Sequence, residues 1–494
     1  MSARPGQLVA RNALRQLVGQ AVPLVAALLS VPWLLAELGP ERFGVLTLLF
    51  AILGSGSLLD LGTARAVTRL VARALADDQR THVAPLLGTA ALLQLALGSL
   101  VALALALGAN ALTLGLGTPE HLRGDAHGGL VAGALILPVA LLAGSLRGAV
   151  EAVQRFDIVN RVRVPTQLAN QLVPLLVVSL GGGLTEATVG LLVVRLLSLG
   201  AWRGAVRSAI GIPQVWALPQ RKTVADVLRF GSWASVSALC GPLLGQGERV
   251  LVGTLRSAAE LAVYAAPLDA MLRLLIVPSA VASALFPACS EPGHRSFDLG
   301  RRALQRLVLI GLPAVVCLAP HLEWLLVAWL GPELGGAAAR PALPLLLGVA
   351  LSGLAAIPYT LVQAAGRPEF KARLDLLELP LALGLTYLLT SRYGLLGAAW
   401  SRVALAAFDL LALAVLSARA HGQQTRRWLD AAGATVATLT PVLAGLFVIQ
   451  RLATGPSLGL LAGAAWVAIY AAVLALRHAP ELLRSTSPST EHNP

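Results

Sequence analysis

Three arginines lie within apolar stretches long enough to cross a lipid bilayer: Arg195, Arg273 and Arg402. Counted at 1.5 Å per helical residue from the expected helix starts, they lie roughly 10 to 18 Å along their helices. A charged side chain at that depth costs roughly 2.5 to 3.5 kcal/mol unless it faces a partner or water. We therefore expect each arginine to have a carboxylate partner or to face a hydrated cavity, where it could bind an anionic solute.

Two aspartates are spaced so that they share a helix face with these arginines. Asp269 precedes Arg273 by four residues, and Asp409 follows Arg402 by seven. Residues at such spacings lie on one side of a helix. One interpretation is that the charges form ion pairs, within or between helices, that only hold the packing. The other is that the arginines surround a central cavity, where Asp269 and Asp409 are candidates for ion coupling.

Asp60 is a third candidate for ion coupling, at the cytosolic end of the second apolar stretch. It lies roughly 24 Å along that helix and is followed by Arg65 and Arg69. An interfacial pair, with long side chains reaching the headgroups, also explains this arrangement.

The elements that carry these residues are expected to be membrane helices. The 494 residues are 56% hydrophobic and only 13% charged, with a mean hydropathy of +0.74, too few polar residues to cover a soluble globule. Apolar runs of roughly 20 residues without alternation favour helices over a β-barrel. We expect an all-α polytopic protein of about 14 spans, which begin near residues 14, 44, 83, 128, 163, 186, 229, 261, 304, 342, 374, 395, 431 and 457.

Basic residues crowd the connections on one side of these spans. Of 38 lysines and arginines, 28 lie at the termini and in the connections from even-numbered to odd-numbered spans, 7 lie in the opposite connections, and 3 lie within spans. Positive charge near spans stays in the cytoplasm. The sequence thus predicts a multi-pass protein of the cell (inner) membrane with both termini in the cytoplasm.

The longest cytoplasmic connection divides the chain after the sixth span. It contains Pro213 and Pro219, and weak similarities at an offset of roughly 210 to 220 residues suggest a repeat on either side of it. We expect an N-terminal lobe of six spans (1–208), a linker (209–228) and a C-terminal lobe of six spans (229–418). Two further spans (419–484) and a disordered tail (485–494) would follow.

Several functional classes have no support in the sequence. The net charge of +13 comes from short connections rather than a separate basic cluster, so anionic lipid headgroups are expected partners and nucleic acid is not. We find no nucleotide loop, nucleophile motif or metal-spaced histidines, and predict no catalytic residue, metal or cofactor. The three cysteines, without CxxC spacing, are expected to be packing residues.

Short segments spread over most of the chain resemble the polysaccharide repeat-unit flippases of the multidrug/oligosaccharidyl-lipid/polysaccharide (MOP) exporter superfamily. No single segment is diagnostic, and the resemblance depends on their order and spacing. They are Leu38–Gly44 (LGPERFG), Leu59–Gly62 (LDLG), Glu248–Tyr264, Leu285–Pro287 (LFP), Leu330–Glu333 (LGPE), Gln363–Arg367 (QAAGR) and Tyr393–Ala398 (YGLLGA).

The resemblance implies two lobes around a cavity that opens alternately to the cytosol and to the outside. The implied cargo is an oligosaccharide linked to undecaprenyl pyrophosphate, with a glycan polymerase and glycosyltransferases as possible partners. Relatives often have basic residues on the first, second, seventh and eighth spans, which correspond here to Arg15, Arg65, Arg249 and Arg273. Among these only Arg273 is expected to lie deep in the membrane, so the ring of basic residues is incomplete in this sequence.

The leading hypothesis is therefore a flippase with Arg65, Arg195, Arg273 and Arg402 as substrate-binding residues. A multidrug or cation antiporter of the same superfamily is a second hypothesis, which needs a carboxylate in an otherwise neutral cavity. A membrane glycan polymerase or ligase is a third. Such enzymes usually carry a large external loop with acidic residues or histidines, and the longest external connection here spans only about residues 109–127.

Overall fold

The computed structural model describes residues 26, 29–50, 63–115, 118–153, 155–212, 215–217, 240, 243–290, 295–428, 439, 443–446, 448 and 455–484. These residues form helices joined by short connections, with no strand among them, which confirms the all-α class. Seven of the helices or helix pairs in this part are long and apolar enough to span a membrane. The number of 14 spans stays a prediction.

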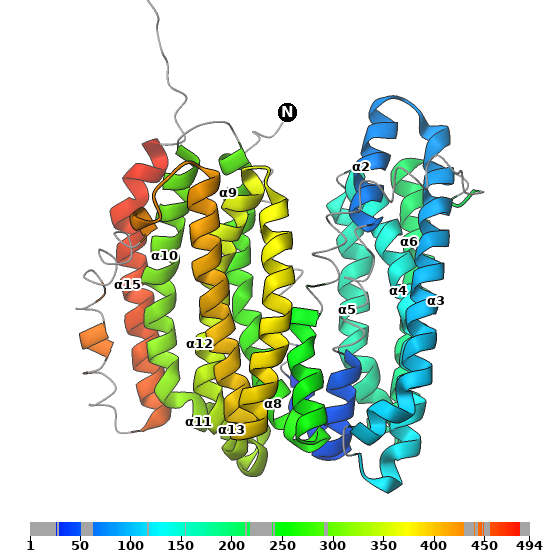
Figure 1. Cartoon of the computed structure of the whole chain (residues 1–494), viewed down its shortest axis with the longest axis horizontal. Helices are drawn as coiled ribbons and strands as arrows, with labels where there is room; N and C mark the ends of the chain where they lie inside the picture. The colour runs from blue at the N-terminus through cyan, green and yellow to red at the C-terminus, as the bar shows by residue number, and fades with distance from the viewer. Residues whose placement is uncertain are drawn as a thin grey trace, which may run out of the picture.

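The first bundle, blue to cyan-green in Figure 1, contains α2 to α6. Residues 29–50, also helical, lie at its lower edge beside the second bundle. The bounds are Thr63–Ala76 for α2, Val83–Gly115 for α3, Arg123–Ala152 for α4, Phe156–Ser179 for α5 and Leu184–Ile210 for α6, with the short 3-10 helices η1 (Arg80–His82) and η2 (Glu120–Leu122).

The second bundle, green to red in Figure 1, begins with the helical residues 243–255 and continues from α8 to α15. Its bounds are Ala258–Leu272 for α8, Arg273–Leu275 for η3, Ile276–Ser290 for α9, Arg295–Leu318 for α10, Ala319–His321 for η4, Leu322–Leu330 for α11, Pro332–Ala364 for α12, Pro368–Ala420 for α13 and Pro456–Arg484 for α15. The expected spans near 229 and 431 lie largely outside the described residues.

Glycines with positive φ interrupt the regular helical backbone between or within helices. Gly39 has φ 73° and Gly331 has φ 85°, and each is followed by Pro and Glu. A glycine takes the left-handed region without a Cβ clash, and a proline fits the first turn of the next helix. Gly394, with φ 61°, likewise divides α13 into two halves, as expected for separate spans beginning near 374 and 395.

The two bundles contact each other at one end and pack separately at the other. The largest hydrophobic cluster joins residues of both bundles, for example Leu46 with Leu261. At this end the helices approach so closely that a Cβ on Gly44 would lie 1.8 Å from the carbonyl oxygen of Ala258. At the other end, the cluster around Val67 lies within the first bundle and the cluster around Phe297 within the second.

Candidate functional site

A cavity of about 480 Å³ lies between the two bundles. Both bundles supply its wall, which combines apolar and aromatic side chains with amides and charged groups. The lining residues are Val31, Leu34, Phe43, Thr47, Phe50, Ile136, Asn170, Gln171, Leu191, Arg195, Gln246, Arg249, Asp269, Ala270, Leu272, Arg273 and Trp329. A concave site with convergent polar groups is the usual form of a ligand-binding pocket.

Two of the sequence-predicted arginines face this cavity from opposite bundles. Arg195 comes from the middle of α6 and is half-buried, whereas Arg273 follows the end of α8 and is exposed. Among the described residues neither guanidinium has an ion-pair partner. Because an arginine carries five donors and stays charged, the pair offers a cationic surface to an anionic ligand.

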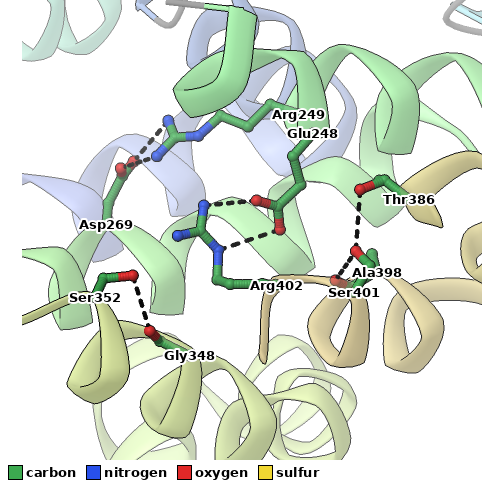
Figure 2. A network of polar contacts seen from close by, with 9 residues as sticks. All are labelled: Glu248, Arg249, Asp269, Gly348, Ser352, Thr386, Ala398, Ser401 and Arg402. Atoms are coloured by element: carbon green, nitrogen blue, oxygen red, sulfur yellow. Dashed lines mark hydrogen bonds and ion pairs between the residues drawn. The ribbon is translucent and has the colours of Figure 1, made fainter. Parts of the chain in front are cut away.

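Arg249 is a third cavity arginine, and its position corrects a sequence prediction. Arg249 is one of the 7 basic residues that the sequence assigns to the opposite connections, but it lies in the helical residues 243–255 with 5% of its surface exposed. Its Nη1 donates to Oδ2 of Asp269 at 3.5 Å, and its Nη2 pairs with Oδ1 of the same carboxylate (Figure 2). Asp269 therefore pairs with a neighbouring helix rather than with Arg273 on its own chain segment.

Arg402 does not line the cavity. Its Nη2 donates to Oε2 of Glu248 at 2.6 Å and its Nε to Oε1 at 3.3 Å (Figure 2). Glu248 is 8% exposed, so the pair is buried between the helical residues 243–255 and the second half of α13. Arg402 thus has a carboxylate partner from another helix, and its expected same-face neighbour Asp409 lies in a different cluster.

Asp409 belongs to a charged cluster centred on Lys371. The ammonium lies 2.8 Å from Oδ1 of Asp409, 2.9 Å from Oδ1 of Asp375 and 3.7 Å from Oε2 of Glu378. Asp375 and Glu378 are buried inside the second bundle. This cluster is separate from the lining of the cavity.

Two further candidates fall where the structure gives no side-chain information. Asp60 lies outside the described residues, and Arg65 belongs to α2 with its side chain outside the described part. Their proposed roles stay predictions. In the part of the chain that the structure describes, no group of histidine, cysteine or acidic side chains could hold a metal ion, and Cys240, Cys289 and Cys317 form no disulfide.

The lining charges give the cavity a net positive charge. Arg195, Arg249 and Arg273 contribute three positive charges and Asp269 one negative charge, a net of +2. In the sequence, the burial of Arg249 is indicated by the adjacent opposite charges of Glu248 and Arg249, which lie in a mostly apolar stretch long enough to form a helix. Charge counting placed it in a connection because a span of roughly 20 residues that begins near residue 229 ends just before it.

Comparison with known proteins identifies the family. The model of the family described as polysaccharide biosynthesis protein matches residues 9–292. A Shigella flexneri protein named "Putative O-antigen transporter" is 28% identical over 399 residues, which cover 80% of this chain and 94% of that protein.

Solved structures have the same fold. A structure titled "Lipid II flippase MurJ, inward closed conformation" superposes with a TM-score of 0.72 at 12% identity, covering 93% of this chain and 98% of that one. An inward-facing multidrug resistance MATE family transporter of the MOP superfamily superposes with a TM-score of 0.64 at 15% identity, covering 85% and 98%. The chain therefore belongs to the polysaccharide biosynthesis protein family and is a multi-pass membrane protein with the fold of the MOP-superfamily transporters.

Proposed function

We propose that this transporter moves an oligosaccharide linked to undecaprenyl pyrophosphate from the cytoplasmic to the outer leaflet of the cell membrane by alternating access. The observation that carries the proposal is the cavity between the bundles with a net charge of +2. A pyrophosphate diester carries two negative charges at neutral pH, so its headgroup charge is equal in magnitude and opposite in sign to that of the cavity. The name of the Shigella flexneri relative supports a glycan cargo.

The arrangement of the bundles supports alternating access. They are in contact at the end that contains Gly44 and Ala258, and they pack as separate clusters at the end that contains Val67 and Phe297. The separated end carries the basic connections, which favour the cytoplasm. We infer an inward-facing state with a cytoplasmic opening, both termini in the cytoplasm, and an inner-membrane location.

The two lobes of this proposal correspond to the two bundles, with 1–208 and 229–418 as their approximate limits. The end of α6 at Ile210 and of α13 at Ala420 lies within two residues of those limits. Residues 419–484 would add two helices outside the lobes. The proposed partners are membrane lipids, a glycan polymerase, and the glycosyltransferases that would synthesise the cargo.

The membrane potential is a candidate driving force. With a negative cytoplasm, outward movement of each negative charge gains about 2.3 kcal/mol per 100 mV. Of the carboxylates considered for ion coupling, Asp269 has the best placement because it lines the cavity and pairs with Arg249. Asp409 pairs with Lys371 away from the cavity lining, and Asp60 has no described position.

A multidrug or cation antiporter is the second candidate, since one structural neighbour is a multidrug resistance transporter. Such a function needs an unpaired carboxylate to attract a cationic drug. Asp269 is paired with Arg249, and two further arginines line the same wall. These charges disfavour a cationic substrate and favour the flippase.

The decisive experiment removes Arg273, which has no ion-pair partner among the described residues. Arg273→Ala is expected to abolish glycan export in a host strain lacking its own copy of the gene, with membrane abundance unchanged. Arg392→Ala, at an exposed arginine outside the cavity, is the matched control. Normal export by Arg273→Ala would show that Arg273 is not needed to bind the substrate.

A second experiment tests the driving force. Purified protein in proteoliposomes should move a fluorescent undecaprenyl-pyrophosphate lipid faster when an imposed potential favours outward movement of anions. Indifference to the potential, together with dependence on a proton or sodium gradient, would replace this mechanism with ion antiport.

A further inference from the structure

The cavity wall carries two amide side chains whose oxygens have no hydrogen-bond partner among the described residues. Asn170 comes from α5 in the first bundle and Gln246 from the helical residues 243–255 in the second. Asn170 Oδ1 and Gln246 Oε1 are buried, and neither accepts a hydrogen bond within the described part of the chain. Buried polar atoms normally have a partner, so two exceptions in one cavity wall indicate a partner supplied from outside the protein.

The chemistry of these atoms selects among the parts of a lipid-linked glycan. An amide oxygen accepts hydrogen bonds and needs a donor, which an ionised pyrophosphate does not offer. A sugar hydroxyl both donates and accepts. If either amide were turned by 180°, its NH₂ group would face the same space, and a hydroxyl would still satisfy it. In both orientations the amides fit a polyhydroxylated group.

The rest of the wall fits the remaining parts of the same ligand. Arg195 and Arg273 offer donors to anionic oxygens, and Nε of Arg249 is a further buried donor that has no partner in the described part of the chain. Trp329 and Phe43 supply aromatic surface to the wall, against which the apolar face of a sugar ring can pack. The cavity therefore combines groups suited to phosphate with groups suited to sugar.

We propose that Asn170 and Gln246 bind the hydroxyl groups of the sugar attached to the pyrophosphate and so determine which glycans are accepted. The proposal rests on the proposed function. Because the two amides come from different bundles, a sugar bound to both links the bundles directly. A lipid pyrophosphate without sugar would bind the arginines alone and lack this link.

The test measures binding of two probes to purified protein in nanodiscs: undecaprenyl pyrophosphate and the same lipid bearing one hexose. Wild-type protein is expected to bind the hexose lipid about tenfold more tightly. Asn170→Leu and Gln246→Met, which keep side-chain size, should each lose most of that difference while binding undecaprenyl pyrophosphate as before. Gln167→Met, an exposed amide on the same helix outside the cavity, is the control.

The outcomes separate this proposal from the proposed function. Equal binding of the two lipids by wild-type protein, or an unchanged hexose preference in both amide variants, overturns the role of the amides. Failure of wild-type protein to bind either lipid overturns the proposed function instead. Binding of undecaprenyl pyrophosphate also reports folding, and a variant that loses it is replaced by Asn170→Ser or Gln246→Ser in the same comparison.

Discussion

The carboxylate of Glu248 lies 2.6 Å from Nη2 of Arg402, although 154 residues separate them in the chain. The side chain of the next residue, Arg249, extends in a different direction and pairs with Asp269 (Figure 2). One short helical segment thus forms a buried ion pair with α13 and a cavity-lining pair with α8. The Glu248–Arg402 pair links helices within the second bundle. The Arg249–Asp269 pair faces the cavity where a substrate would bind.

Arg402 is expected to contribute stability rather than substrate binding. Arg402→Met should lower the melting temperature in detergent strongly, because loss of one partner from a buried ion pair costs about 3 to 5 kcal/mol. The double variant Glu248→Leu/Arg402→Met leaves no unpaired charge and should recover most of the stability. It should also retain transport, and a folded double variant without transport would instead make Arg402 a substrate ligand.

Lys371 should be essential for the folding of the second bundle. Lys371→Met leaves Asp375, Glu378 and Asp409 close together without a cation. Their repulsion is relieved when protons bind, so the loss of melting temperature should be larger at pH 8 than at pH 5.5. Adding Asp409→Asn should restore part of it. A loss that does not depend on pH would show that Lys371 acts through packing alone.

Asp269 is expected to compete with an anionic ligand for Arg249. Asp269→Asn removes the negative charge from the cavity wall and releases the guanidinium, so the net charge rises from +2 to +3. At an effective dielectric constant of about 20, the interaction energy between two unit charges about 8 to 16 Å apart is about 1 to 2 kcal/mol. Undecaprenyl pyrophosphate should therefore bind about tenfold more tightly, measured in nanodiscs.

Glu333→Gln, at an exposed carboxylate outside the cavity, is the control for this charge change. The two variants remove the same charge, so only the position differs between them. Weaker binding by Asp269→Asn would mean that the carboxylate orients Arg249 for the ligand rather than competing with it.

Gly44 should be required for contact between the two bundles. Even the methyl group of Gly44→Ala would lie 1.8 Å from the carbonyl oxygen of Ala258, so the helices have to move apart. Spin labels on Cys variants of the exposed Glu120 and Glu333 should then report longer distances by electron resonance.

The native cysteines are buried, which favours selective labelling of these introduced sites. Gly108→Ala, whose Cβ would meet no atom within 4 Å, should leave the distance distribution unchanged. An unchanged distribution in Gly44→Ala would exclude this contact as the closure between the bundles.

Hydropathy and local backbone chemistry predicted much of the fold. Long apolar runs predict membrane helices because each helix satisfies its own backbone hydrogen bonds in lipid. The turns at Gly39, Gly331 and Gly394 were also predictable, because glycine and proline act on the backbone within a few residues. Arg195, Arg273 and Arg402 were each expected to have a carboxylate partner or to face a cavity. The structure places Arg195 and Arg273 in the cavity wall and pairs Arg402 with Glu248.

The sequence by itself determined that several charges lie at membrane depth, and only the tertiary structure decided which of them pair. Asp269 pairs with Arg249 rather than Arg273, and Arg402 with Glu248 rather than Asp409. Helical spacing defines which residues share a face of one helix, but the partner across an interface depends on how separate helices pack. That packing brings Arg249 and the unpaired amides of Asn170 and Gln246 to one cavity, a contact that no local pattern encodes.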